Sequence, residues 1–245
     1  MDLSHTLVNS LFSTIMLVRQ SKNTFIRVYD KVGYITNQLT RYDRSYNETG
    51  ADFLSKISRE PQEIENIIFE LHNLYGDSVA LDKLKYDFEK FIADLEKHYF
   101  LVTGTSKEEC DKKDFEFSYS LGNMKTKIYD FTQSTEQNLS ISTEDYMLAL
   151  DQKKPQLKSV QFELTSRCNE RCIHCYIPNS KKDMGNDMSY EQVCNIIDQF
   201  ASIGGLHVTL SGGEVFLHKD IIRIIQYCRK KDMEICILSN LISLK

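Results

Sequence analysis

Strand-like and helix-like patterns alternate along the C-terminal part of the chain, from Leu157 onward. Apolar and polar residues alternate, as they do in strands, in three segments: 159–165, 206–210 and 234–238. The two segments between them carry apolar residues at helical spacing, and the first opens with a capping box of Ser189 and Gln192. Strands separated by helices pair in parallel through right-handed crossovers. The alternation in residues 156–245 therefore predicts an α/β fold.

Three cysteines follow the first of these strands, in the run Cys168-Asn-Glu-Arg-Cys172-Ile-His-Cys175. Three thiolates on one short loop can hold three corners of a four-iron cluster, which leaves the fourth iron open to a substrate or cofactor. A structural zinc site is the alternative, although zinc usually takes four ligands from paired Cys-x-x-Cys elements. His174 lies between two of the cysteines and is too cramped to complete the same tetrahedron comfortably, but a distant cysteine could supply the fourth ligand.

A second motif, Ser211-Gly212-Gly213-Glu214, follows the second strand. Two glycines allow a backbone to approach a ligand without a Cβ clash, and the carboxylate of Glu214 can accept hydrogen bonds from an ammonium group. Taken alone, Gly-Gly is also a common turn. The motif lies at the carboxyl end of a strand, where α/β folds place their functional sites.

The cysteine spacing, its position after a strand and the second motif together resemble the radical S-adenosylmethionine (radical SAM) superfamily. The resemblance covers residues 157–245 and implies a partial (β/α) barrel. It implies that Cys168, Cys172 and Cys175 bind a [4Fe-4S] cluster whose fourth iron chelates SAM. Reductive cleavage of SAM would then give a radical that takes hydrogen from the substrate, with an electron donor such as flavodoxin or ferredoxin.

The same resemblance implies further cofactor contacts. His174 would pack on the adenine of SAM, and the second motif would approach its methionyl part through Ser211, Gly212, Gly213 and Glu214. Ser239 and Asn240 stand where relatives often carry a Thr-Asn-Gly turn, so Ser239 is a further candidate. Leu241 replaces the glycine of that turn.

Residues 20–104 have the pattern of a small α+β domain of winged-helix type. Three short strands are expected: 25–29, 34–36 and 41–46. Asn47 is then expected to cap a helix. Two longer amphipathic helices follow, the first expected to start at Pro61 and end at Gly76, the second to cover residues 82–98.

This region resembles the peptide-recognition domain of pyrroloquinoline quinone biosynthesis in its strand order, its two amphipathic helices and the segment Tyr46-Asn47-Glu48-Thr49-Gly50-Ala51. The resemblance implies that the leader of a precursor peptide adds as a strand near residues 40–46, beside the helix near 82–98. A winged-helix DNA-binding domain is the alternative. The net charge of -5 disfavours a nucleic-acid partner. So do five acidic residues of the last helix: Asp82, Asp87, Glu89, Asp94 and Glu96.

The chain is expected to reside in the cytoplasm, away from membranes. The apolar stretch Leu7–Val18 is too short to span a bilayer and has no basic region before it. Seven cysteines in a chain of this size without a signal peptide indicate reduced thiols.

These observations predict four regions: an N-terminal segment (1–19), the peptide-recognition domain (20–104), a linker (105–155) and the N-terminal part of a radical SAM barrel (156–245). The barrel region holds fewer β/α units than the family's partial barrel, so we expect it to be truncated. The whole predicts a peptide maturase of the SPASM type that cleaves SAM to modify a ribosomally made precursor peptide. Two alternatives stay open: a leader-binding module with a vestigial barrel, and a zinc-stabilised regulatory protein.

Overall fold

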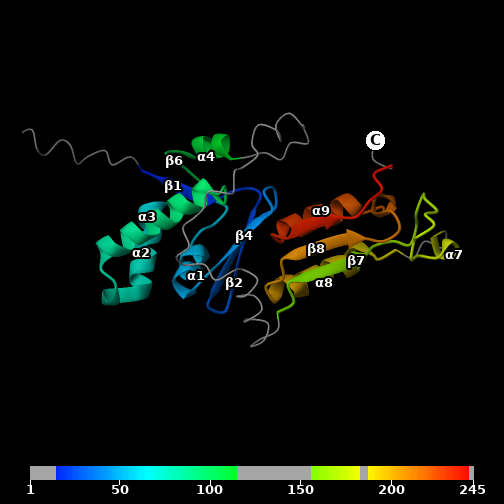
Figure 1. Ribbon diagram of the computed structural model, residues 1–245, viewed down its shortest axis with the longest axis horizontal. Coiled ribbons are helices and arrows are strands. Elements are labelled where there is room, and N and C mark those ends of the chain that lie inside the picture. The colour runs from blue at the N-terminus through cyan, green and yellow to red at the C-terminus, as the bar shows by residue number, and fades with distance from the viewer. Residues whose placement is uncertain (1–14, 115–155, 183–186, 243–245) are drawn as a thin grey trace, which may run out of the picture. The chain divides into compact units, whose positions relative to one another are not determined.

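A computed structural model describes residues 15–114, 156–182 and 187–242 of the chain (Figure 1). The chain divides into two units, residues 1–143 and 144–245, and each has a hydrophobic core of its own. Within the described ranges, no helix combines the length and the apolar character that crossing a bilayer requires.

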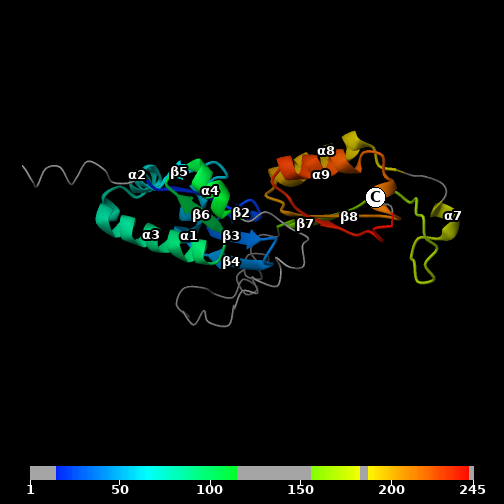
Figure 2. The same ribbon diagram turned by 90° about the horizontal axis from the view of Figure 1, so that it is seen from above.

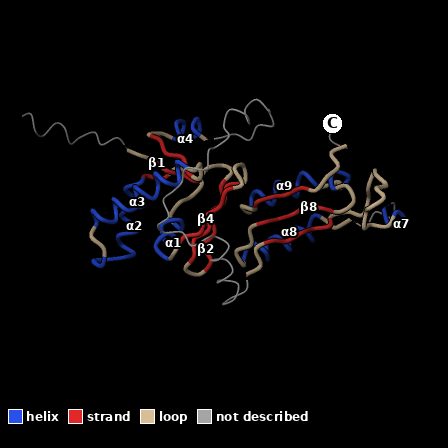
Figure 3. Tube along the Cα trace, viewed as in Figure 1, coloured by secondary structure: helices blue, strands red, loops and turns tan. Residues whose placement is uncertain are grey.

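The first unit contains two small antiparallel sheets (Figure 3). One has the order β2 (Thr24–Tyr29), β3 (Val32–Asn37), β4 (Tyr42–Tyr46). The other has the order β5 (Gln62–Glu63), β1 (Leu17–Gln20), β6 (Leu101–Gly104). The three strands expected in this region are therefore confirmed as β2, β3 and β4.

The helices described in the first unit are α1 (Glu48–Ser55), α2 (Ile64–Tyr75), α3 (Leu81–Lys97) and α4 (Lys107–Lys113), with the 3-10 turn η1 (Gly76–Ser78) after α2. Asn47 caps α1 as expected, since its side chain accepts a hydrogen bond from the Gly50 N–H at 3.1 Å. The expected helix start at Pro61 is wrong. The helix begins at Ile64 because the two residues before it pair with β1 as the short strand β5.

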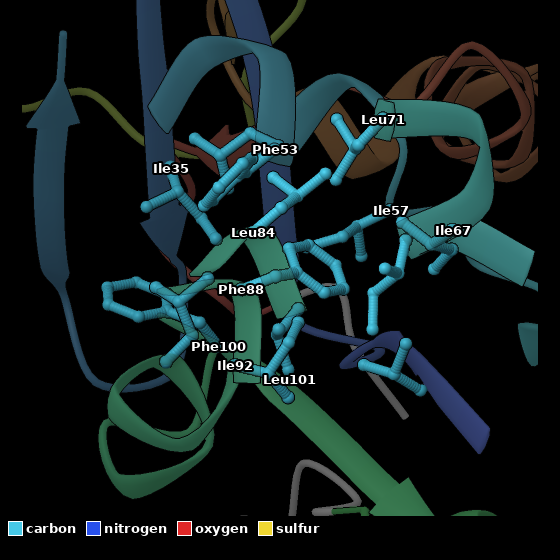
Figure 4. Packing of buried hydrophobic residues seen from close by; sticks show 14 residues of the cluster. Ile35, Phe53, Ile57, Ile67, Leu71, Leu84, Phe88, Ile92, Phe100 and Leu101 are labelled. Carbon is cyan, nitrogen blue, oxygen red and sulfur yellow. The ribbon is translucent and has the colours of Figure 1, made fainter. Parts of the chain in front are cut away.

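The core of the first unit lies between the helices and the sheets (Figure 4). Phe88 of α3 is fully buried at its centre, and its ring meets that of Phe53 from α1 edge-on, with centroids 5.2 Å apart. Ile35 brings β3 into the same cluster, and Leu101 brings β6. Two helices and two strands of the first unit are thus held together by the burial of apolar surface.

Two elements lie outside the expected boundaries of this domain. The strand β1 begins inside the segment expected to precede the domain, and α4 lies inside the expected linker, whose remaining residues, 115–155, fall outside the described ranges. A buried ion pair joins the two elements: Arg19 of β1 donates to Asp114, just after α4, at 2.6 Å. Asp114 also accepts from Ser21 Oγ at 3.1 Å and the Lys22 N–H at 3.0 Å, so its buried charge is well satisfied.

Replacing Phe88 with Ala should lower the free energy of unfolding by about 3–5 kcal/mol, because a fully buried aromatic side chain is lost and a cavity remains. Phe69 of α2 is a matched control, since its side chain is 65% exposed. Phe69→Ala should change the same quantity by no more than about 0.5 kcal/mol. Urea unfolding followed by circular dichroism measures both, and equal losses would contradict the packing in Figure 4.

The second unit is built on a parallel sheet of β7 (Ser159–Glu163), β8 (His207–Ser211) and β9 (Glu234–Ile237), in that order. The helix α8 (Tyr190–Ser202) connects β7 to β8, and α9 (Ile221–Lys230) connects β8 to β9. The predicted strand–helix alternation and parallel pairing are confirmed. So is the capping box, in which the Ser189 and Gln192 side chains each accept from the other residue's backbone N–H.

Both connecting helices cover the same face of this sheet (Figure 2). Their apolar residues, among them Ile197 and Ile224, pack on Phe162 and Leu210 of the strands. The opposite face carries polar residues: Gln161 and Glu163 are exposed there. The sheet therefore has one buried face and one polar face. The loops that contain the cysteines and the Gly-Gly-Glu motif begin at its carboxyl edge.

Candidate metal centre

The three loops that leave the carboxyl edge of the sheet contain all the site residues expected from the sequence except Ser211, which ends the strand β8. The cysteine loop (residues 165–176) follows β7, the Gly-Gly-Glu loop (212–214) follows β8, and the third loop (238–241) follows β9. Parallel register brings them to one edge, since Glu163 lies beside Ser211 and Leu210 beside Ile237. Ser211 itself is the last residue of β8 and is buried.

The cysteine loop presents three free thiols. Cys172 is exposed and Cys168 and Cys175 are half-buried, and none of them forms a disulfide. A short turn brings the Cys175 N–H to the Cys172 carbonyl at 3.2 Å. This donor set fits an iron–sulfur cluster, because reduced thiolates on a surface loop are the ligands that such clusters take. The thiols are not gathered around one point, however: nowhere in the described ranges do three His, Cys, Asp or Glu side chains converge to hold a metal ion.

Arg167 anchors the cysteine loop at its start. Its guanidinium pairs with Asp187 and donates to the Leu217 carbonyl at 3.1 Å. Thr165 Oγ1 also donates to Asp187, at 2.5 Å, and accepts from the Arg167 N–H at 3.1 Å. The residue before the first cysteine is thus fixed to the segment that leads into α8.

Lys182 holds the same loop from another side. It ends the short helix α7 (Asn179–Lys182), its side chain is buried, and its Nζ donates to the Glu170 carbonyl at 3.0 Å. Arg167, Asp187 and Lys182 were not predicted from the sequence. Their sequence positions follow no motif, because Arg167 bonds to Asp187 and Leu217, and Lys182 bonds to Glu170, at unrelated separations along the chain.

Gly212 and Gly213 are required by a direct backbone contact with the cysteine loop. The Gly213 N–H donates to the Thr165 carbonyl at 2.8 Å, and the next residue's N–H, that of Glu214, donates to the Arg167 carbonyl at 2.8 Å. A Cβ on Gly212 would lie 2.4 Å from the Thr165 carbonyl oxygen, and one on Gly213 would lie 2.1 Å from that of Arg167. Gly212 also has a φ of 136°, which side chains disfavour. The close approach made by these glycines is therefore to the loop that carries the cysteines.

Glu214 is fully buried and engaged by its own chain. Its Oε1 accepts from the Phe216 N–H at 3.0 Å and from Ser239 Oγ at 2.8 Å, and its Oε2 accepts from the Asn240 N–H at 2.8 Å. The structure therefore brings Ser239 to the Gly-Gly-Glu loop through a hydrogen bond. The sequence pattern did not indicate this bond, or the one by which Asn240 reaches Asn169 in the cysteine loop.

His174 is exposed in the cysteine loop, and Tyr176 follows the last cysteine. The Tyr176 hydroxyl donates to Glu163 Oε1 at 2.9 Å, on the polar face of the sheet. Partial burial and then the neighbouring carboxylate raise the pKa of Tyr176, so the hydroxyl keeps its proton in this hydrogen bond at neutral pH.

Residues 162–245 match the family model of the radical SAM superfamily. The second unit contains a radical SAM domain. This family uses a [4Fe-4S] cluster and SAM, the two cofactors expected from the sequence.

Several curated proteins are similar to the same part of the chain. The antilisterial bacteriocin subtilosin biosynthesis protein AlbA of Bacillus subtilis is 38% identical over 79 residues, which cover 32% of this chain and 17% of AlbA. The Fe-coproporphyrin III synthase of Methanosarcina barkeri is 36% identical over 88 residues, 36% of this chain and 21% of that protein. A GTP 3',8-cyclase of Clostridium botulinum is 31% identical over 78 residues, 31% of this chain and 24% of that protein. The matched regions span about a fifth of these relatives' lengths.

Crystal structures of SuiB from Streptococcus suis also resemble the chain, at 17% sequence identity over 93% of its length. The complex of SuiB with its precursor peptide SuiA gives a TM-score of 0.45 and covers 44% of the SuiB chain. The complex of SuiB with SAM gives a TM-score of 0.46 and covers 43%.

Iodoacetamide at pH 8 should modify the exposed Cys172 and Cys236 and spare the buried Cys110 and Cys228. Burial raises the pKa of the Cys110 thiol, and it raises that of Cys228 to about 12, so both stay protonated and weakly nucleophilic at pH 8. Mass spectrometry of tryptic peptides measures the modification. Fast labelling of Cys228 in the folded chain would contradict the packing of α9 against the sheet.

Proposed function

We propose that the chain carries the cluster and SAM site of an enzyme that modifies a ribosomally made precursor peptide. The observation that supports it most is the three-thiol loop, joined backbone to backbone to the Gly-Gly-Glu loop at the carboxyl edge of a parallel sheet. Two motifs that are separate in sequence meet there, in a domain whose family uses this cofactor pair.

In this proposal Cys168, Cys172 and Cys175 are the cluster ligands. When bound, the cluster and SAM supply one-electron cleavage of a carbon–sulfur bond and a radical that takes hydrogen from the substrate. The chain itself supplies position. Arg167 ties the start of the cysteine loop to Asp187 and to the Leu217 carbonyl. Lys182 holds the loop by the Glu170 carbonyl, and its positive charge favours an anionic cluster beside it.

The remaining site residues would bind SAM. The backbone of Ser211, Gly212 and Gly213 runs beside the cysteine loop with little side chain in the way, so a ligand can approach it closely. Ser239 lies next to this backbone through its bond to Glu214, and the exposed His174 is free to turn over an adenine ring.

Peptide modification rests on the first unit, because relatives of the second unit act on different molecules. One of those relatives, AlbA, is named for the biosynthesis of a bacteriocin. In the first unit, β4 is an edge strand, with no strand paired to its outer side among the described residues. An exposed strand edge is the surface to which an extended peptide adds through main-chain hydrogen bonds.

The helix α3 lies along this edge strand and would form the other wall of the leader site. Arg44 of β4 pairs with Asp94 of α3. The ring of Tyr46 meets that of Phe91 edge-on, with centroids 5.0 Å apart.

Replacing Cys172 with Ser should abolish cluster assembly, because one of three protein ligands is lost. After anaerobic reconstitution with iron and sulfide, the unaltered chain should hold about four irons, as one cubane cluster requires, and C172S should hold less than one. Cys236→Ser is the matched control, since Cys236 is exposed but lies on β9. It should retain the full iron content. Stoichiometric zinc in place of iron in the unaltered chain would contradict the proposal and favour a zinc-stabilised protein.

Leader binding should protect β4 and leave β2, the other edge strand of the same sheet, unchanged. The probe is a synthetic leader peptide whose sequence is to be sought among the small reading frames near the gene. Amide hydrogen exchange at residues 42–46 should slow at least about tenfold when the peptide pairs with β4. Protection of residues 24–29 instead, or of neither strand, would contradict the proposed leader site. Protection of β4 in a chain that assembles no cluster would favour a leader-binding module with a vestigial barrel.

A further inference from the structure

A continuous series of hydrogen bonds joins the three loops at the carboxyl edge of the second unit. Asn240, in the loop after β9, is its centre. The backbone N–H of Asn240 donates to Glu214 Oε2 at 2.8 Å, and its side-chain Nδ2 donates to Asn169 Oδ1 at 2.9 Å. Asn169 directly follows Cys168. The position of a proposed cluster ligand is thereby connected to the carboxylate of the Gly-Gly-Glu loop.

Glu214 is the fixed end of this series. Its side chain is fully buried, and each of its oxygens already accepts from the chain: Oε1 from Phe216 and Ser239, Oε2 from Asn240. A buried carboxylate needs such donors, and hydrogen bonds to a charged acceptor are among the stronger ones. An ammonium group of a ligand could reach the remaining acceptor site of Glu214 only by entering the interior, because the side chain is fully buried. Its present geometry favours holding the third loop.

The third loop is itself held in one conformation. Ser239 Oγ accepts from the Leu241 N–H at 2.9 Å, and Asn240 Oδ1 accepts from the Ile242 N–H at 3.0 Å. Leu241 has a φ of 62°, in the left-handed region that leucine rarely adopts. A strained residue persists where its surroundings determine its conformation. These bonds therefore aim the Asn240 side chain at Asn169.

We propose that Glu214 and Asn240 are positioning residues that set the cysteine loop relative to the Gly-Gly-Glu loop, acting through Asn169. The effect of this positioning on SAM binding rests on the proposed function, in which the cysteine loop holds the cluster and the Gly-Gly-Glu loop holds SAM. The two loops must then keep a fixed distance from each other. Loss of the Asn240–Asn169 bond frees the start of the cysteine loop on that side. Arg167 and the backbone contact still hold its base, so the cysteines keep the cluster while SAM binds more weakly.

The link is tested first in the chain without cofactors, where amide hydrogen exchange reports the cysteine loop directly. Asn240→Ala and Asn169→Ala should each speed exchange across residues 168–176 at least about fivefold, and the double variant should be no faster than either single one. Asn169→Asp keeps the acceptor oxygen and should restore the slow exchange. Asn195→Ala, an exposed asparagine of α8, is the matched control and should change nothing. Additive effects in the double variant would overturn the inference.

The consequence is tested after reconstitution, by titrating SAM and following the shift in the electron paramagnetic resonance signal of the reduced cluster. Asn240→Ala should retain the iron content of the unaltered chain and need at least about tenfold more SAM for the half-maximal shift. Asn169 and Asn240 are exposed, so these variants should fold. Glu214→Gln, at the buried carboxylate to which Asn240 donates, is to be compared in the same SAM titration. An unaltered SAM titration in Asn240→Ala overturns the inference. An unaltered chain that assembles no cluster overturns the proposed function, while the exchange experiment still decides whether the link exists.

Discussion

Direct contact between the backbones of two loops is the constraint on which the second unit depends. The Gly-Gly-Glu loop donates two backbone hydrogen bonds, each 2.8 Å long, to the carbonyls of Thr165 and Arg167, and a Cβ on either Gly212 or Gly213 would collide with those carbonyls. The cysteine loop is thus fixed at its start before any metal is considered. The bonds made by Glu214, Asn240 and Asn169 add a side-chain connection to the same pair of loops. Chemistry at this edge requires that the two loops keep their spacing, and glycine is the residue that permits it.

The local elements of the fold could be predicted because their causes are local. Apolar periodicity and the Ser189–Gln192 capping box define α8, and alternation defines β7, β8 and β9. The strand β5 could not be predicted, because two residues form a strand only when β1 is there to pair with them. The helix α4 joins the first unit through Arg19 and Asp114, which lie 95 residues apart in the sequence.

The same distinction separates the site residues that the sequence revealed from those that it did not. The three cysteines and the Gly-Gly-Glu motif stand at short, specific spacings, so their chemistry could be inferred from residue type. The bond between Asn169 and Asn240 joins residues 71 positions apart, and neither residue belongs to a periodic pattern. Glu214 was expected from its residue type to accept hydrogen bonds, and its donors within the chain, Phe216, Ser239 and Asn240, could not be named from the sequence. A motif can thus predict which residues form a site, but the hydrogen-bond partners of those residues are determined by the tertiary fold.

The two units contribute differently to the proposed function. Residues 162–245 determine cofactor chemistry but not substrate, since the same region is similar to a bacteriocin biosynthesis protein, a coproporphyrin synthase and a GTP cyclase. Selection of a peptide is therefore assigned to the first unit, whose edge strand β4 and helix α3 offer a surface for an extended chain.

The central claim is that three cysteines hold three irons of a cluster and leave the fourth for SAM. Mössbauer spectroscopy of the chain reconstituted with ⁵⁷Fe, recorded with and without SAM, tests it most directly. The account predicts that SAM changes the spectrum of one iron in four and leaves the other three in tetrahedral sulfur coordination. Four equivalent irons that do not respond to SAM would contradict it.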